Sequence, residues 1–218
     1  MEYANKWNKY TIGEIPWINS RISHPTRMKF ISDIFRIKPK SILEIGAGEA
    51  IEARVAKIFY PKIRYCLSDV SNTFLQYAED NDIECYESDM VNLSNSFGAN
   101  EFDLVYMHGV LEHTPNLKET IKQMSIVSKK YYIVMFKWRI KSGGIKSDYN
   151  HQREFYSTEF NLNKVLDTIV SKSKNINIQI VTEKGRVHNY AKYLENIPNV
   201  DVHRNGNYIT IIGEWKDG

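Results

Sequence analysis

The fold of this chain is decided by the stretch Ser41-Ile42-Leu43-Glu44-Ile45-Gly46-Ala47-Gly48-Glu49-Ala50. Residues 41–45 are mostly apolar and predict a short buried strand, and Gly46 and Gly48 then open a turn. Apolar residues at helical spacing over 49–59 predict a helix directly after the turn. The glycines let the backbone bend tightly and let a ligand approach the main chain closely. Strand, glycine turn and helix are typical of the first unit of a nucleotide-binding α/β fold.

The glycine turn lacks the pattern of a dinucleotide-binding site. That pattern requires a third glycine where Ile51 stands, and it places a pyrophosphate at the start of the helix. Glu49 instead puts a carboxylate at the positive end of the helix, where the pyrophosphate would lie. No Gly-Lys-Ser/Thr sequence follows the turn, which excludes a P-loop. A cofactor without phosphates therefore suits this turn better.

Length and composition indicate one globular domain. The 218 residues suffice for an α/β domain with a full core, and 42% hydrophobic and 25% charged residues are ordinary values. A net charge of +3 at pH 7 is too small to indicate a nucleic-acid partner. The sequence shows neither a membrane-spanning run nor the apolar region of a signal peptide. We therefore expect a cytoplasmic monomer or homodimer with no nucleic-acid or membrane partner.

The two cysteines, Cys66 and Cys85, lie in apolar runs that resemble strands. This placement predicts small core residues in a reducing compartment and not a disulfide. Cysteine and histidine do not occur at metal-binding spacings, so we expect no dedicated metal site.

Asp69 ends a second predicted strand, 63–70, roughly twenty residues after the glycine turn. At that place in a nucleotide-binding half-sheet, a carboxylate accepts charge-assisted hydrogen bonds from ribose hydroxyls. The alternative is that Asp69 caps the helix predicted over 72–80, a role for which Ser71 and Asn72 compete. Because the glycine turn lies upstream, we expect ribose binding.

Two later stretches repeat the arrangement of a strand with polar residues at its end. Residues 83–89 predict a third short strand that ends in Asp89 and is followed by Met90, although aspartate is also a common turn residue. Phe-Asp-Leu-Val begins at residue 102 in a fourth strand that ends at His108, and Val-Leu-Glu-His follows at 110–113.

These stretches resemble those of a known enzyme family. Glu-Ile-Gly-Ala-Gly at 44–48 resembles the first motif of the class I S-adenosylmethionine (SAM)-dependent methyltransferases. Phe-Asp-Leu-Val at 102–105 and Val-Leu-Glu-His at 110–113 closely resemble the fourth-strand motif of the small-molecule members, including the ubiquinone-type O-methyltransferases. Ala50 departs from the family, because it replaces the usual final glycine.

A fourth segment extends the resemblance to about residues 39–160. His-Gln-Arg-Glu-Phe-Tyr-Ser-Thr-Glu-Phe at 151–160 is similar to the segment after the fifth strand of these methyltransferases. Ser157 or Thr158 would there cap the following helix.

The resemblance implies SAM as cofactor and S-adenosyl-L-homocysteine (SAH) as product. The backbone of the glycine turn would contact the amino-acid part of SAM. Asp69, after the second strand, would bind the ribose, and Asp89, after the third strand, would bind the adenine. Arg27, in the helix predicted over 26–37, could reach the cofactor carboxylate, with a solvated helix arginine as the alternative. The implied cofactor residues are Glu44, Gly46, Ala47, Gly48, Asp69, Val70, Asp89, Met90, His108 and Arg27.

Three histidines are candidates for a catalytic base, because imidazole is well tuned for proton transfer at neutral pH. His113 corresponds in the family to a histidine near the methyl-transfer site, and we rank it before His108 and His151. The alternative for His113 is a histidine at a helix start that bonds to a neighbour.

The acceptor site is expected at the end of a fifth strand, predicted over 131–138. The basic residues there, Lys137, Arg139, His151 and Arg153, would bind an anionic group, unless they form a solvated basic loop. The aromatic residues of segment 1–25, Trp7, Tyr10 and Trp17, would form a lid over the ligand or pack as an arm on the core.

The remaining periodicity completes an α/β domain. We expect helices over 117–127 and 160–171, strands over 176–182 and 208–215, and a short helix over 186–196. The predicted fold is Rossmann-like and doubly wound, with a mostly parallel seven-stranded sheet, a C-terminal antiparallel strand and helices on both faces. One domain would span 1–218, with an arm and helix (1–37), a cofactor core (38–160) and a C-terminal part (161–218).

The predicted function is methyl transfer to an oxygen, with nitrogen as the alternative, of a small polar and anionic metabolite. The acceptor would carry a phosphate or carboxylate, as in a precursor of a sugar, surface glycan or secondary metabolite. Two other functions stay open: a non-catalytic partner protein with a SAM fold, and an NAD-dependent reductase. The missing third glycine and Glu49 count against the reductase, and the acids Glu44, Asp69 and Asp89 count against loss of the cofactor site.

Overall fold

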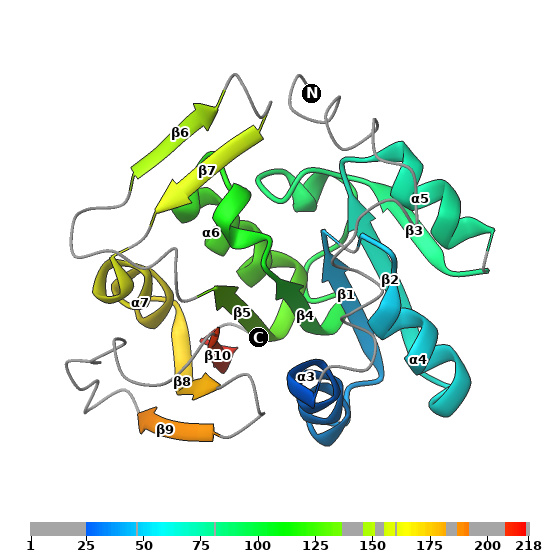
Figure 1. Cartoon of the computed structure of the whole chain (residues 1–218), viewed down its shortest axis with the longest axis horizontal. Helices are drawn as coiled ribbons and strands as arrows, with labels where there is room; N and C mark the ends of the chain where they lie inside the picture. The colour runs from blue at the N-terminus through cyan, green and yellow to red at the C-terminus, as the bar shows by residue number, and fades with distance from the viewer. Residues whose placement is uncertain are drawn as a thin grey trace.

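A computed structural model describes residues 25–46, 48–80, 82–136, 146–150, 155–159, 161–181, 187–191 and 208–216. Within these residues the strands form an eight-stranded sheet of order β3-β2-β1-β4-β5-β10-β8-β9 and a separate two-stranded sheet, β6-β7 (Figure 1).

Five adjacent strands of the large sheet are parallel: β1 (Ser41–Ile45), β2 (Arg64–Asp69), β3 (Glu84–Glu87), β4 (Phe102–His108) and β5 (Ser128–Phe136). β1 pairs with β2 on one side and with β4 on the other, so the strand order reverses at β1. In open parallel sheets, ligands bind outside the carboxyl ends of the strands at such a switch point.

The C-terminal strands make the sheet mixed. β10 (Tyr208–Trp215) runs antiparallel between β5 and β8 (Ser173–Val181), and β9 (Val187–Ala191) pairs antiparallel with β8 at the edge. The predicted fold class is confirmed, and β9 adds a strand to the seven expected. The short helix expected over 186–196 is wrong, because residues 187–191 pair with β8 and tertiary pairing overrides a local pattern.

The helices cover both faces of the sheet (Figure 1). One face packs against α3 (Pro25–Arg36), α4 (Ile51–Phe59) and α5 (Asn72–Glu79), and its core includes Ile42, Tyr106 and Val134. The other face packs against α6 (Leu117–Val127) and α7 (Leu162–Val170), and its core includes Leu43, Met107 and Ile133. Consecutive strand residues are thus buried on opposite faces, which explains why these strands are almost continuously apolar.

Short 3-10 helices lie at η1 (Leu93–Asn95) and η2 (Leu111–His113). No helix of the described part is long and apolar enough to cross a membrane. Cys66 and Cys85 are both free thiols, and Cys66 is buried in β2.

The hairpin of β6 (Lys146–Asn150) and β7 (Phe155–Glu159) was not predicted from the sequence. Ser157 and Thr158 lie inside β7, so their prediction as caps of the next helix is wrong; Asn161 caps α7, and its side chain accepts a hydrogen bond from the Lys164 amide. The buried Thr158 hydroxyl donates instead to the carbonyl of Thr114 at 2.7 Å. This bond holds the hairpin against the loop that follows β4.

We expect Gly213→Ala to lower the free energy of unfolding by about 1–3 kcal/mol, the usual cost of overpacking. A Cβ at Gly213 in β10 would overlap the Asn175 carbonyl and the Tyr131 ring. Urea unfolding followed by circular dichroism measures the change. Gly98→Ala is the control, because its Cβ would lie 3.7 Å from Glu101 and its stability should hardly change. Equal stability of the two variants would contradict the packing described for β10.

Candidate active site

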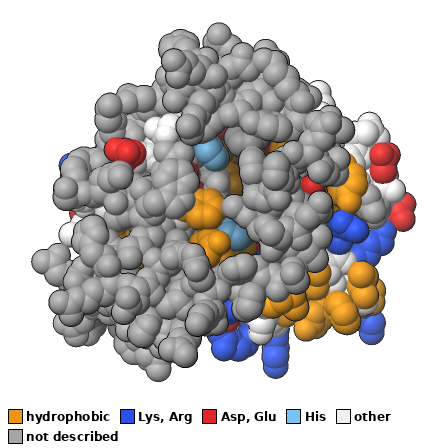
Figure 2. Space-filling model, in the orientation of Figure 1, with side chains coloured by type: hydrophobic (Ala, Val, Ile, Leu, Met, Phe, Trp, Pro, Cys, Tyr) orange, Lys and Arg blue, Asp and Glu red, His pale blue; other side chains and the backbone are white. Residues whose placement is uncertain are grey.

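The candidate site lies beyond the carboxyl ends of β1, β2 and β4, at the edge of the sheet where Gly46, Gly48, Asp69 and His108 lie. Figure 2 shows a hollow in this view of the molecule, with histidine and hydrophobic side chains inside it. Among the described side chains, the histidines are His108 at the end of β4 and His113 in the loop that follows.

The glycine turn after β1 leaves open space for a ligand. Gly46 has φ +67° and Gly48 has φ +53°, a backbone region that favours glycine. A Cβ at Gly46 would overlap Val110, whereas a Cβ at Gly48 would have no atom of the described residues within 4 Å. The turn is therefore packed closely on its inner side and open at Gly48.

The helix after this turn begins later than predicted. α4 starts at Ile51, behind Ala50 at φ 55°, so Glu49 lies in the turn and not in the first helical residues. Glu49 is buried, and its carboxylate still precedes the helix start.

Asp69 lies where the sequence places it, at the end of β2 and beside the glycine turn. Its carboxylate accepts hydrogen bonds from the amides of Gly48 at 3.4 Å and Ser71 at 2.9 Å. Burial raises the pKa of Asp69 to about 6, although these hydrogen bonds oppose the rise. The N-cap of α5 is Ser71, so Asp69 is not the helix cap. A buried carboxylate next to an open backbone turn suits an acceptor of ribose hydroxyl hydrogen bonds.

Asp89 and Met90 follow β3 at the same edge of the sheet, and both are buried. Asp89 accepts from the Val91 amide at 3.2 Å, as a turn residue does, and burial raises the pKa of its carboxyl. The carbonyl of Asp69 accepts from the Ser88 amide at 3.0 Å, which holds the ends of β2 and β3 together. Contacts of Val70, Asp89 and Met90 with a cofactor remain predictions.

Glu44 belongs to a buried polar cluster beneath the turn. It accepts from the Tyr65 hydroxyl at 2.8 Å, and burial, with help from nearby Glu52, raises the pKa of Glu44 well above its ordinary range. Glu52 in turn binds Arg27 at 2.7 Å and accepts from the Tyr106 hydroxyl at 3.3 Å. The alternative of a solvated Arg27 is wrong, because its side chain is 13% exposed and ion-paired. The cluster ties α3 to α4, and direct contact of Glu44 or Arg27 with the cofactor remains a prediction.

The two histidines with described side chains lie at the end of β4 and in the loop that follows. His108 is half-buried and lies against the Phe30, Phe136 and Tyr208 rings, with centroids 5.1, 6.0 and 5.8 Å away. His113 ends η2, and its amide donates to the carbonyl of Val110 at 2.8 Å. As the sequence predicts, His108 ends β4 and His113 lies in the loop after it.

Glu112 is a residue whose role the sequence analysis did not identify. Its buried carboxylate accepts a 2.6 Å hydrogen bond from the amide of Phe136, the last described residue of β5. The bond joins η2, in the loop after β4, to the end of β5. The motif Val-Leu-Glu-His contains this glutamate, but the amide that it binds is 24 residues away and no local pattern indicates it.

Several predicted site residues lie outside the described residues, and their roles stay predictions. They are Trp7, Tyr10, Trp17, Ala47, Lys137, Arg139, His151 and Arg153.

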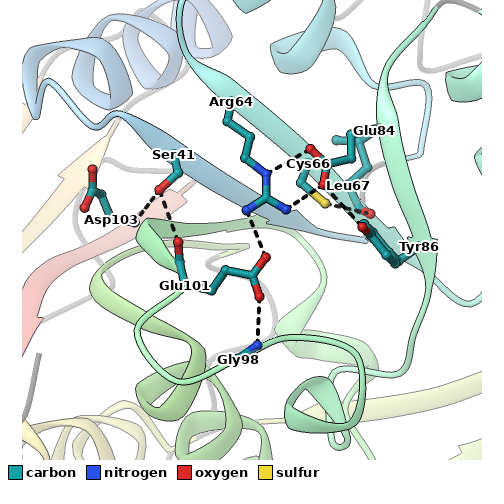
Figure 3. A network of polar contacts seen from close by, with 9 residues as sticks. All are labelled: Ser41, Arg64, Cys66, Leu67, Glu84, Tyr86, Gly98, Glu101 and Asp103. Atoms are coloured by element: carbon teal, nitrogen blue, oxygen red, sulfur yellow. Dashed lines mark hydrogen bonds and ion pairs between the residues drawn. The ribbon is translucent and has the colours of Figure 1, made fainter.

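The charged network in Figure 3 lies at the opposite edge of the sheet, where β1, β2 and β4 begin. Arg64 binds Glu84 at 2.6 Å and Glu101 at 2.8 Å, and the Ser41 hydroxyl accepts from the Asp103 amide at 2.9 Å. The Arg64 side chain is 40% exposed, so these pairs contribute little to stability. We assign the network a structural role.

Comparisons with known proteins agree with this geometry. Residues 43–129 match a family model described as a methyltransferase domain, while a search of curated proteins found no match. A possible histamine N-methyltransferase from Thermotoga maritima is 14% identical, with a TM-score of 0.64, over 97% of this chain and 99% of that one. The 1,6-didemethyltoxoflavin-N1-methyltransferase from Burkholderia thailandensis, solved with 1,6-didemethyltoxoflavin and SAH, is 14% identical, with a TM-score of 0.61, over 98% of this chain and 86% of that one.

The N-terminal domain of EvdMO1, also solved with SAH, is 13% identical, with a TM-score of 0.62, over 89% of this chain and 82% of that one. At these identities the similarity establishes the fold, which is that of the SAM-dependent methyltransferases. The family match begins within β1 and ends at the start of β5, and so contains the glycine turn, Asp69, Asp89 and the β4 loop. These site residues therefore lie in the part of the chain that is similar to a methyltransferase domain.

The site residues fit SAM. The open side of Gly48 accommodates a ligand against the main chain, and the buried carboxylate of Asp69 lies beside it. The phosphate-binding features of a dinucleotide site are missing from this turn, because Glu49 and Ala50 precede α4.

We expect SAH affinity to fall as the pH drops through about 6, by up to about tenfold per pH unit. Protonation removes the charge that strengthens the hydrogen bonds from ribose, and the pKa of Asp69 is raised to about 6. Asp69→Asn should weaken SAH binding at pH 7.5 by roughly 10–100-fold and should abolish the pH dependence. Calorimetric titration at pH 5, 6 and 7.5 measures both effects.

Asp82→Asn is the matched control, because the Asp82 side chain is 94% exposed and lies away from the turn. It should bind SAH as the unmodified chain does at every pH. An Asp69→Asn variant with the original affinity and pH dependence would remove Asp69 from the binding site.

Proposed function

We propose that this protein is a SAM-dependent methyltransferase that methylates an oxygen of a small, polar, anionic metabolite in the cytoplasm. The observation that carries the proposal is the buried Asp69 carboxylate, which accepts from the Gly48 amide where the turn is open. Glu44, Asp89 and Met90 surround the same edge of the sheet, as a single extended cofactor requires.

When bound, SAM supplies a methyl group already activated by its sulfonium. The protein must chiefly align the acceptor atom with that methyl, and such positioning can lower a barrier by roughly 7–11 kcal/mol. The β4 loop suits this task because it is fixed on several sides: Val110 packs on Gly46, and Glu112 binds the Phe136 amide. His113 in this loop would accept the proton of the attacking hydroxyl.

The acceptor is proposed from the sequence around the end of β5. Lys137, Arg139, His151 and Arg153 would bind a phosphate or carboxylate, since guanidinium groups recognise these anions bidentately. A sugar, surface-glycan or secondary-metabolite precursor has this chemistry. Nitrogen is the alternative acceptor atom, because two structural neighbours are named as N-methyltransferases.

A partner protein with the same fold but no catalysis is the second candidate function. One neighbour with a TM-score of 0.61 is a methyltransferase in complex with an activator, which shows this fold in an assembly with another chain. The open turn and the buried Asp69 favour an intact cofactor site and therefore an enzyme.

The first experiment is calorimetric titration with SAM and, in parallel, with NADH. We expect SAM to bind with micromolar affinity and NADH not to bind, because the turn lacks a pyrophosphate site. Acceptor candidates are then screened in pairs with and without a carboxylate or phosphate, and the anionic member should be methylated. A folded protein that binds NADH but not SAM would refute the proposal, and SAM binding without any methylation would favour the partner protein.

We expect His113→Asn to lower kcat by roughly 10²–10⁴-fold on the acceptor found in that screen, because a general base contributes a factor of this size. SAH affinity should stay unchanged, which separates this variant from Asp69→Asn. Steady-state kinetics together with calorimetry measure both quantities. An unchanged kcat would show that the imidazole of His113 takes no part in proton transfer.

A further inference from the structure

Four aromatic rings meet beyond the ends of β4 and β5 in an aromatic cluster of Phe30, His108, Phe136 and Tyr208. Tyr208 begins β10, which runs antiparallel to β5, so its ring reaches the same edge of the sheet as Phe136. The ring centroids of Phe136 and Tyr208 lie 5.5 Å apart, and Phe30 lies 5.5 Å from Tyr208. Within the cluster the Phe30 ring is fully buried, whereas the rings of His108, Phe136 and Tyr208 are half-buried.

The backbone around the aromatic cluster is built to hold these rings. Gly109 has φ +65°, and a Cβ there would overlap the Phe136 ring, so glycine lets that ring lie directly over the end of β4. The Gly109 amide donates to the Val134 carbonyl at 2.9 Å, and Glu112 accepts from the Phe136 amide at 2.6 Å. Phe136 is thus fixed by the hydrogen bond from its amide to Glu112 and by the close approach of Gly109, and the Gly109–Val134 bond holds Gly109 in place.

The place of the cluster in the sheet indicates what it contacts. The residues that fit the cofactor follow β1, β2 and β3, whereas the cluster follows β4 and β5 on the other side of the switch point. The Gly46–Val110 contact makes the two halves adjacent. A molecule held on the β4–β5 side therefore lies next to the open end of the cofactor site, and it would meet aromatic faces and edges.

We propose that the aromatic cluster is the acceptor subsite, and that it binds a planar aromatic or heteroaromatic ring carrying the atom to be methylated. This inference rests on the proposed function and narrows its acceptor to an aromatic anion. Phe136 and Tyr208 are specificity-determining residues that contact the acceptor ring. Aromatic rings pair favourably in offset and edge-to-face arrangements, beyond the effect of buried area alone, so such a subsite prefers a flat ring over a saturated one.

The test compares phenylacetate with cyclohexylacetate, two carboxylates of similar size of which one is aromatic. Both are titrated by ligand-observed NMR into the full chain, with and without saturating SAH. We expect phenylacetate to bind roughly fivefold more tightly. Phe136→Leu and Tyr208→Leu should each remove most of this preference. Phe59→Leu is the control, because the Phe59 ring is 70% exposed on α4 and the preference should persist.

Equal affinities for the two probes would overturn the proposal, as would a preference that survives both Phe136→Leu and Tyr208→Leu. Tighter binding of tetramethylammonium than of phenylacetate would also overturn it, in favour of a cation site. SAH binding is measured on the same samples, so a failure of the cofactor assignment is seen separately. The affinity ratio of phenylacetate to cyclohexylacetate therefore tests the aromatic subsite whether or not SAH binds.

Discussion

The close packing of Gly46 against Val110 is the constraint on which the site depends. It brings the turn after β1, on the cofactor side, against the loop after β4, which follows His108 and carries His113. A larger residue at position 46 would push the two loops apart, since a Cβ there has no room. The parallel strands place both loops at one edge of the sheet, and this contact fixes the distance between them.

Buried carboxylates that accept hydrogen bonds from backbone amides also hold the strand ends in place. Glu112 joins the loop after β4 to the end of β5, and Asp69 joins the end of β2 to the glycine turn. Each carboxylate replaces lost hydration with backbone amide donors, which is how a buried acid is tolerated. The strand ends are thus held by groups whose hydrogen-bonding geometry is directional, and the loops beyond them keep a defined shape.

The sequence predicted those features of the fold and site that depend on residues close together in the chain. α6 and β10 have the predicted bounds, and Asp69 and His108 end their strands as expected, because a strand that ends in a polar residue is a local signal. β3 ends at Glu87, two residues before the predicted Asp89. The β6-β7 hairpin, β9 and the aromatic cluster were missed. Their partners lie far away in sequence: β9 needs the edge of β8, and Phe136 meets Tyr208 only because β10 inserts beside β5. Thr158 was likewise predicted as a helix cap, but its hydroxyl donates to the carbonyl of Thr114, which is far away in sequence.

The β6-β7 hairpin is a sheet of its own, paired with none of the eight strands of the large sheet within the described residues. Its buried Thr158 hydroxyl meets a backbone carbonyl at Thr114, and a carbonyl is present whatever side chain stands there. A hairpin of different sequence with a hydroxyl at the same place could dock equally well. The hairpin is therefore a separate module beside the β4 loop, and evolution or a protein engineer could change its sequence without rebuilding the large sheet.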